Sequence, residues 1–443
     1  MRWMVRGVLV AVMLLSGTGC RTGSGQPTFP RESYLAVWAG DADRAHDDFL
    51  AIVDVDPRSK SYGQILYTLP VGSAGNEPHA LNRLARSDGL AFGTGVATSR
   101  IFTFDLRNPS RARLVRVEEG EGAWGLRAPV AIIGLRSGSM FVACPDRAGH
   151  RGTARELFDA PGGLIELDSR GRDVGEHAAA SKRARAFIVA PSDGAIVKQE
   201  RLLVTSNHGH GYASSTTAPF MPGIVVQTWS LDTMAPRGLA VLEVGPRGDE
   251  NLGPLAVRAM RGRRLVLVAT HEGGALYATD SPQLPVPAFK LVYDFGADAR
   301  PGGAAITPDD RFYVVALTGH DEVVSLDVRD PWRPRLADRL RLDATGVGDR
   351  ASPSALTMSA DGTRIAVANY TIDVPAFRRD GDRRVHLIDL DPVTGDLRLA
   401  TGFADEFTGD PGVSFERMTW PHGASGPARP HGVLFVAPVS GDR

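Results

Sequence analysis

The sequence predicts an all-β protein folded as a seven-bladed β-propeller. Residues 303–342 contain four short apolar runs, GAAIT, FYVVAL, VVSLDV and LADRLRL, which are separated by turn-forming residues such as Pro308-Asp309-Asp310. Four such runs in about 40 residues match one propeller blade. An apolar run that ends in aspartate recurs seven times along the chain, at Asp54, Asp105, Asp168, Asp232, Asp280, Asp327 and Asp389. Because one such unit cannot bury its own faces, seven units imply a closed ring.

The chain of 443 residues is long enough for several domains, but a closed all-β ring absorbs nearly all of it into one. Its charge is balanced, with 50 Lys and Arg against 51 Asp and Glu, and no long run has a single sign. This balance argues against a nucleic-acid partner and against a polybasic membrane-binding surface. We expect a monomer.

The first 20 residues have the pattern of a signal peptide. Arg2 and Arg6 precede the apolar run 8–15, and the small residues 16–19 lead to Cys20. The apolar run is too short to span a bilayer as a mature helix. The ending Gly-Thr-Gly-Cys resembles a bacterial lipoprotein signal, which predicts that Cys20 is acylated after cleavage. Plain secretion is the alternative.

Residues 21–32 are predicted to be a flexible tether, followed by the propeller at 33–438. The expected location is therefore the periplasm or cell envelope, with membrane contact only through the N-terminal lipid. Cys144 is the only cysteine left in the mature part of the chain, so no internal disulfide can form there. The fold must be stabilised by its core and by ring closure.

The first blade begins one strand short. Residues 34–39 match the second run of the repeated unit, and two further runs follow up to residue 69. The C-terminal run HGVLFVAP, residues 431–438, has no partners of its own. We expect it to pair beside residues 34–39 and close the ring, which removes the exposed edges of an open sheet.

The remaining blades each begin with an inner run, and these runs start at His79, Val130, Ala195, Pro254, Gly303 and Ser354. Short hairpin signals such as Ser87-Asp88-Gly89 and Asp361-Gly362 connect the inner runs to the second runs. The blade-four turn, Gln199-Glu200, is a weaker signal. The loops 145–161 and 207–224 are longer than usual hairpin loops, which favours a functional role or disorder.

Histidines are concentrated at one end of the predicted ring. Of the 11 histidines, six fall in loops between second and third runs, namely His46, His150, His208, His210, His271 and His320. His79 and His431 begin inner strands and should lie at the same end. Converging imidazoles suit copper, zinc or iron, or proton transfer near neutral pH. The alternative is that each histidine is an ordinary polar residue at a strand end.

Three segments resemble the selenium-binding protein family, which includes methanethiol oxidases. The opening YLAVWAGDADRAHDDFLAIVDVDPRSKSYGQILYTLPV followed by NEPHALN is similar to the start of that family, and DDRFYVVALTGHDEVVSLDVRDPWRPRLADRL resembles its penultimate blade. The tail SFERMTWPHGASGPARPHGVLF resembles a bacterial branch. With gaps, the resemblance extends over residues 33–436.

The resemblance implies a seven-bladed propeller and, in the oxidase members, a copper-dependent oxidation of methanethiol to formaldehyde, hydrogen sulfide and hydrogen peroxide. His79 matches the first of two adjacent family histidines, whereas Ala80 replaces the second. His320 matches a family histidine in the sixth blade. The family's histidine-bearing segment in the third blade is AIIGLRSGS here, and its tail histidine aligns with Phe415. The CxxC of animal members is absent.

Two hypotheses follow from these matches and losses. The first is an exported copper oxidase of small thiols such as methanethiol, with His79, His320, His422 and His431 as leading ligands and with His208 and His210 able to complete the set. The second is a non-catalytic propeller lipoprotein that binds a ligand, such as a metal ion, or a protein partner at the channel mouth. A hydrolase is disfavoured because the sequence has no nucleophile elbow and no convincing triad spacing.

Overall fold

The computed structural model divides into residues 1–30 and residues 31–443, and all the described residues belong to the second unit. The predicted signal peptide, Cys20 and residues 21–31 of the tether lie outside the described residues. Within the described part of the chain, no helix is long and apolar enough to cross a membrane. The described residues are 32–84, 89–120, 124–135, 137–148, 161–179, 186–210, 220–342, 350–370 and 381–438.

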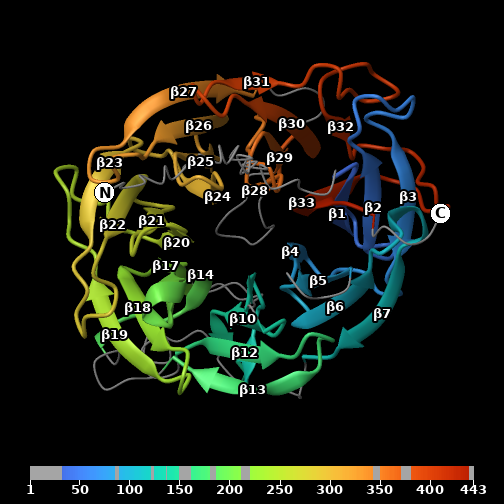
Figure 1. The fold of residues 1–443 in the computed structure, drawn as a ribbon. Coiled ribbons are helices and arrows are strands. Elements are labelled where there is room, and N and C mark those ends of the chain that lie inside the picture. The colour runs from blue at the N-terminus through green and yellow to red at the C-terminus, as the bar shows by residue number, and fades with distance from the viewer. Residues whose placement is uncertain are drawn as a thin grey trace, which may run out of the picture. The chain divides into compact units, whose positions relative to one another are not determined.

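Residues 32–438 fold as seven antiparallel sheets arranged in a ring, so the predicted seven-bladed β-propeller is confirmed (Figure 1). The strands of each blade are named here from the centre of the ring outward, so the first lines the centre and the last lies at the rim. Blade 1 contains β33 (Ala428–Val436), β1 (Tyr34–Asp41), β2 (Phe49–Asp54) and β3 (Ile65–Pro70). Blade 2 contains β4 (Pro78–Arg83), β5 (Leu90–Gly95), β6 (Arg100–Asp105) and β7 (Arg113–Glu118). Blade 3 contains β9 (Ala131–Gly134), β10 (Met140–Cys144), β12 (Gly163–Leu167) and β13 (Asp173–Ala178).

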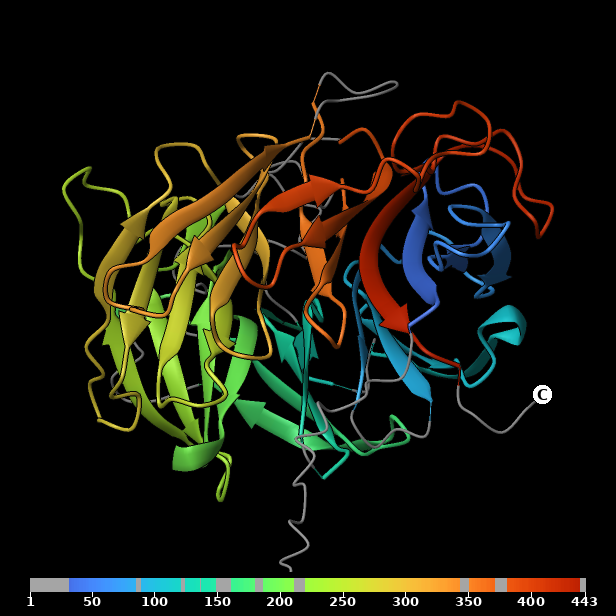
Figure 2. The same cartoon turned by 45° about the horizontal axis from the view of Figure 1, so that its top comes forward.

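The other half of the ring repeats this order (Figure 2). Blade 4 contains β14 (Pro191–Val197), β15 (Leu202–Asn207), β18 (Val225–Ser230) and β19 (Pro236–Val241). Blade 5 contains β20 (Pro254–Ala259), β21 (Val266–Thr270), β22 (Ala275–Thr279) and β23 (Lys290–Asp294). Blade 6 contains β24 (Pro301–Ile306), β25 (Phe312–Leu317), β26 (Glu322–Asp327) and β27 (Arg335–Arg341). Blade 7 contains β28 (Ala355–Met358), β29 (Arg364–Ala368), β30 (Arg384–Leu390) and β31 (Leu397–Leu399), with β32 (Val413–Ser414) beside β30.

Short elements fill some of the connections between these strands. The two-stranded pairs are β8 (Leu126–Arg127) with β11 (Asp146–Arg147), and β16 (Gly209–His210) with β17 (Met221–Pro222). The turns Pro109–Arg111 and Lys198–Glu200 are 3-10 helices, η1 and η3. The second of these, η3, contains Gln199-Glu200, the weak hairpin signal of blade four. It is followed by Arg201, which has a left-handed backbone conformation.

The ring closes between its two ends, as the sequence predicts. The C-terminal strand β33 pairs antiparallel with β1 from Tyr34↔Val436 to Asp41↔Ala428. The pairing begins three residues earlier than the predicted run at residue 431. Blade 1 is therefore built from both ends of the propeller, and the inner edge of β1 is covered by a backbone ladder.

Apolar contacts between neighbouring blades form the core. Trp38 of β1 is fully buried, and its ring lies 5.1 Å from that of Phe102 and 5.5 Å from that of Phe104, both on β6 of the next blade. Its indole Nε1–H donates to the carbonyl of Thr94 at 2.9 Å. The aromatic body is thus buried while its polar atom is satisfied, the arrangement that buried tryptophans need.

Most inner strands begin with the same local backbone conformation, a proline preceded by a residue of positive φ. A proline stands at the start of the strand or two residues before it in six blades, at Pro78, Pro129, Pro191, Pro254, Pro301 and Pro353. In five of these, the residue before the proline has a positive φ between 51° and 66°, namely Glu77, Ala128, Gly253, Arg300 and Ser352. Because this conformation recurs around the ring, it is a feature of the propeller fold. A positive φ at one of these positions therefore does not by itself mark a strained functional residue.

A β-bulge follows this step in several blades. The register with the second strand shifts between Pro78 and Leu81 in β4, and equivalent shifts occur at the start of β14, β20 and β24. In β33 the shift leaves His431 as the extra residue, since Gly432 pairs with Trp38 while Pro430 pairs with Ala39. Bulges redirect side chains, and here the bulged residues line the central channel.

Removal of β33 tests the closure. A chain that ends at residue 427 loses the strand that covers the edge of β1, and we expect it to lose a large part of a typical stability of about 5–15 kcal/mol. Thermal or urea unfolding measures the change. A chain that ends at residue 438 retains β33 and is the control. If the two chains unfold within a degree or two of each other, the ring does not depend on this pairing.

His386 on β30 is buried, and neither of its ring nitrogens has a hydrogen-bond partner among the described residues. Burial and then nearby Arg384 lower the pKa of His386 to about 4. The folded chain therefore holds a neutral imidazole, whereas the unfolded chain takes up a proton near pH 6.5. Stability from this residue is present above pH 6.5 and is lost as the pH falls towards 4.

A His386→Leu variant has a similar side-chain volume and no proton to gain. Between pH 6.5 and pH 4, we expect the free energy of unfolding to fall less in the variant than in the wild type, by up to about 3 kcal/mol. Urea unfolding of both proteins at several pH values measures the difference. An identical pH dependence in wild type and variant would contradict this assignment.

Candidate functional site

The inner strands of all seven blades surround a central cavity of about 610 Å³. Its wall includes His79 and His431 and, farther round the ring, Asp193 and Arg258. Arg258 Nη1 lies 2.6 Å from Asp193 Oδ2, so the two charges are paired inside the channel. The cavity is large enough for a small molecule. Its wall is mostly apolar or made of small residues, and its polar side chains include the two histidines and the Asp193–Arg258 ion pair.

The first polar group is a pair of imidazoles in close, tilted contact. The rings of His79 on β4 and His431 on β33 have centroids 4.1 Å apart and an interplanar angle of 36°. The Nδ1–H of His431 donates to the carbonyl of His79 at 3.0 Å, which leaves its Nε2 as the unprotonated nitrogen. The predicted adjacency of His79 and His431 in neighbouring blades is confirmed.

The two imidazoles are held neutral. Burial, followed by the neighbouring His431 and His208, lowers the pKa of His79 well below its ordinary value. Burial also lowers the pKa of His431 to about 4. His79 Nδ1 is buried without a hydrogen-bond partner among the described residues. Neutral imidazole is the form that binds metals, and an unpartnered buried nitrogen needs an explanation such as a bound ion.

A tyrosine and a carboxylate support this pair. Tyr370 follows β29 of blade 7, and its hydroxyl donates to Glu77 Oε1 at 2.6 Å. Glu77 immediately precedes β4 of blade 2, so the bond spans the closing strand β33. The Tyr370 ring lies edge-on to His431 at 6.1 Å, and the Arg429 guanidinium lies 5.6 Å from the Tyr370 ring centroid. The Tyr370 ring is therefore a packing partner of His431 in addition to His79.

A second polar group lies at the junction of blades 4 and 5. His208 follows β15, and His271 and Glu272 follow β21. One ligand atom from each lies within 4.8 Å of the other two. His208 Nε2 is 3.0 Å and 3.1 Å from the two Glu272 carboxylate oxygens. The Nδ1–H of His271 donates to the carbonyl of Pro301 at 2.9 Å. Burial lowers the pKa of His271 to about 4.

A chain of backbone hydrogen bonds connects these two histidines. The N–H of Gly223 donates to the carbonyl of His208 at 2.7 Å, and that of Gly253 donates to Gly223 at 2.8 Å. The N–H of His271 then donates to the carbonyl of Gly253 at 2.7 Å. Gly253 has a φ of +66°, and an added Cβ would lie 1.7 Å from Glu272 Oε2, so only glycine fits there.

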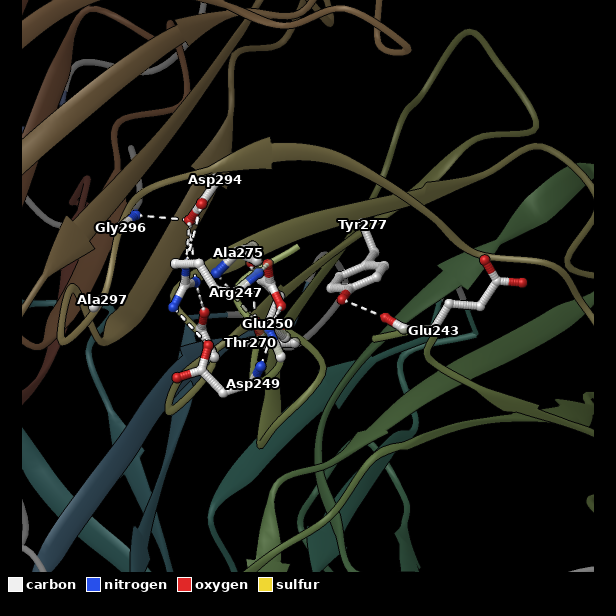
Figure 3. A network of polar contacts seen from close by, with 12 residues as sticks. Glu243, Arg247, Asp249, Glu250, Thr270, Ala275, Tyr277, Asp294, Gly296 and Ala297 are labelled. Atoms are coloured by element: carbon white, nitrogen blue, oxygen red, sulfur yellow. Dashed lines mark hydrogen bonds and ion pairs between the residues drawn. The ribbon is translucent and has the colours of Figure 1, made fainter. Parts of the chain in front are cut away.

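The loop before Gly253 is clamped to the loop that carries Glu272 (Figure 3). The Arg247 guanidinium contacts Asp294 at 3.1 Å and donates to the carbonyl of Gly273. The Glu250 carboxylate accepts the N–H groups of Arg247 and Gly248, and the Thr270 hydroxyl donates to the Glu250 carbonyl at 2.6 Å. Together these bonds hold the loop that carries Glu272 against the loop that connects blades 4 and 5.

The other predicted ligands lie elsewhere. His320 Nε2 contacts the carbonyl of Ala297 at 3.1 Å, in the loop between blades 5 and 6. His422 contacts Thr68 of β3 at 2.7 Å, near the rim of blade 1. As placed, His79, His320 and His431 do not form a group with ring nitrogens within 4.8 Å of one another. His150 and the side chain of His210 lie outside what the structure describes.

Sequence reasoning identified His79, His431 and His208 but did not find the partners of these residues. Glu77 and Tyr370 are far apart in sequence, and so are His208 and Glu272. One signal was available for the second group, since His271 occupies the same loop position in blade 5 as His208 does in blade 4. Asp193 and Arg258 gave no signal, because isolated charges in strands are common.

Comparison with known proteins gives consistent matches at low identity. Methanethiol oxidase of Bos taurus is 22% identical over 445 residues, which cover 86% of this chain and 91% of that protein. Methanethiol oxidase of Hyphomicrobium sp is 26% identical over 160 residues, or 33% of this chain and 36% of that protein. The proteins that match this chain are named methanethiol oxidases and a selenium-binding protein. The resemblance found in the sequence is confirmed. No protein-family model matches the chain.

A solved structure supports the same grouping at the level of the fold. The hypothetical selenium-binding protein of Sulfolobus tokodaii superimposes with a TM-score of 0.74 at 17% identity, covering 94% of this chain and 96% of that chain. A periplasmic gluconolactonase of Pseudomonas aeruginosa superimposes with a lower TM-score of 0.57. These structural matches show the propeller fold.

The copper that the family implies can be tested against the residues present. Imidazole nitrogens suit copper, and the unpartnered His79 Nδ1 beside the oriented His431 ring gives two such donors. Ala80 and the segment 131–139 supply no imidazole where the family has one. The pair therefore offers two imidazole donors, and among the described residues no third histidine, cysteine or carboxylate ligand joins them.

Proposed function

We propose that this protein is an exported propeller that oxidises a small thiol such as methanethiol, with copper held by His79 and His431. The observation that carries the proposal is the close, tilted imidazole pair in the wall of the channel, with a buried His79 nitrogen that has no partner among the described residues. Copper would supply redox chemistry there. The similarity to methanethiol oxidases over most of the chain supports the substrate class.

The residues of this chain have separate roles in the proposal. His79 and His431 hold the ion, and the hydrogen bond between the His431 ring and the His79 carbonyl orients the second ligand. Tyr370 and Glu77 position His431 and do not touch the thiol. The glycines and alanines on β24, Gly302 to Ala305, leave room in the channel for a substrate.

The reaction balances with dioxygen and water as the co-reactants. Methanethiol, dioxygen and water give formaldehyde, hydrogen sulfide and hydrogen peroxide, so the carbon is oxidised and dioxygen is reduced. Both co-reactants are available in a cell envelope. The neutral imidazoles add no positive charge of their own, so a thiolate beside them would be attracted chiefly by the metal.

A non-catalytic binding propeller is the alternative, and a specific observation favours it. The family histidines are replaced at Ala80 and across 131–139, so the donor set in the channel is smaller than the resemblance implies. A protein that binds a metal or small ligand through His79 and His431 needs no further donors. The two functions share the site and differ in turnover.

Copper titration and a methanethiol assay on the full chain separate these functions. We expect copper binding by competition with a chromophoric chelator, and dioxygen-dependent release of formaldehyde and hydrogen peroxide. The double variant His79→Ala/His431→Ala should bind one copper ion fewer than the wild type and lose turnover, and His177→Ala, on the rim of blade 3, should change neither. Copper binding without turnover supports the binding propeller. Equal copper binding by the double variant and wild type refutes both functions.

Export is part of the proposal and rests on the N-terminal sequence alone. The full chain should appear in the membrane fraction and should incorporate labelled fatty acid. A Cys20→Ala variant should lose the label and leave that fraction, since one thiol carries the predicted lipid. Cell fractionation and lipid labelling measure this. A soluble cytoplasmic wild-type protein that retains Met1 would rule out export.

A further inference from the structure

The group formed by His208, His271 and Glu272 is separate from the imidazole pair in the channel. Neither His79 nor His431 belongs to it, and none of its members lines the channel cavity. We propose that these three residues form a second metal site, which binds a borderline divalent cation of the zinc class and joins blades 4 and 5. This inference does not depend on the proposed thiol oxidation.

The donor set selects this class of ion. Two imidazole nitrogens and one carboxylate oxygen are ligands of Zn²⁺ in sites that keep an open position, and the same set also suits Fe²⁺. Imidazoles argue against Mg²⁺ and Ca²⁺, which prefer oxygen ligands. The absence of a sulfur donor from the group argues against Cu⁺.

The geometry is close to that of a bound ion. Nitrogen and oxygen ligands about 2.0–2.1 Å from one tetrahedral zinc lie about 3.4 Å from each other. His208 Nε2 and the nearer Glu272 oxygen are 3.0 Å apart, and one ligand atom of His271 lies within 4.8 Å of both. The ion would replace the hydrogen bond between His208 and Glu272, and the Nε2 proton of His208 would be released to water.

The ligands are oriented before any ion binds. The His271 Nδ1–H bond to the Pro301 carbonyl makes Nε2 the lone-pair nitrogen, and a backbone carbonyl is a usual partner for a zinc-bound histidine. The hydrogen bonds through Gly223 and Gly253 hold the His208 and His271 backbones together, and Arg247 holds Gly273 next to Glu272. Little ordering remains to be done on binding, which favours affinity.

The site is also accessible. The side chains of His208 and His271 are buried, whereas that of Glu272 is 21% exposed, so an ion can approach from its side. Phe220 packs on His208 with a centroid distance of 4.9 Å and shields the other side. A partly exposed carboxylate beside two buried imidazoles is the arrangement expected of a cation site that fills from solvent. The competing explanation is a simple hydrogen-bonded His–Glu pair.

Zinc binding by the metal-free full chain tests the proposal. The chain is stripped with a chelator, titrated with Zn²⁺ against a competing dye and analysed for retained metal after gel filtration. We expect one zinc ion per wild-type chain, with affinity reduced about tenfold or more in Glu272→Gln and in His271→Gln. Parallel titrations with Fe²⁺ under anaerobic conditions and with Mg²⁺ identify the preferred ion, and Mg²⁺ should not compete.

Two controls separate this site from others. His177→Gln removes a histidine that also contacts a carboxylate, Glu166 at 3.0 Å, but lies outside the three-residue group. It should bind zinc like wild type. His79→Ala should also retain this zinc ion, so a failure of the copper proposal leaves the zinc result unchanged. Absorption bands of Co²⁺ bound to the wild-type chain report nitrogen ligation without any variant.

The proposal is overturned if the wild-type chain retains no zinc after gel filtration and Co²⁺ gives no ligand-field bands. It is equally overturned if Glu272→Gln, His271→Gln and His177→Gln, all folded by circular dichroism, bind zinc with the same affinity as wild type. In either case the His208–Glu272 contact is a hydrogen bond between two blades and nothing more.

Discussion

The pairing of β33 with β1 is the interaction on which the rest of the structure depends. Without it, the inner edge of β1 would expose unpaired backbone groups, and blades 7 and 2 would lose the strand between them. The same strand carries His431. Closure of the ring and assembly of the imidazole pair are therefore one event, because His431 reaches His79 only when β33 is in place.

The fold could be predicted from the sequence because its signal is repeated. Seven apolar runs that end in aspartate and a leftover C-terminal run are enough to count blades and to predict closure. The inner strands were harder, since β14 begins four residues before the predicted start at Ala195. The proline that starts or precedes six of the inner strands was the missed signal. In five of these blades the residue before the proline has a positive φ, and the β-bulge that follows in several blades directs side chains into the channel.

The candidate sites could be predicted only in part, for a geometric reason. The position of a strand in the chain can be predicted from its own apolar run. His79 and His431 could therefore be placed at the start of neighbouring inner strands. Contacts across a blade junction depend on loop conformation, which a local pattern does not encode. Glu272 meets His208 because Gly223 and Gly253 allow the two loops to approach. His320 and His422 illustrate the converse, as residues of the right type whose loops direct them to other partners.

The two histidine groups differ in what surrounds them, and this difference separates their chemistry. His79 and His431 face a cavity that can admit a small molecule, so a ligand bound there can meet a substrate. His208 and His271 are enclosed by backbone that is hydrogen-bonded between blades 4 and 5, and only Glu272 extends toward solvent. An ion in the second group would bridge two blades without contacting the channel. If both proposals hold, the propeller has a position for reaction on its inner strands and a position for a bridging ion in its loops, and Ala80 lies in the first of these.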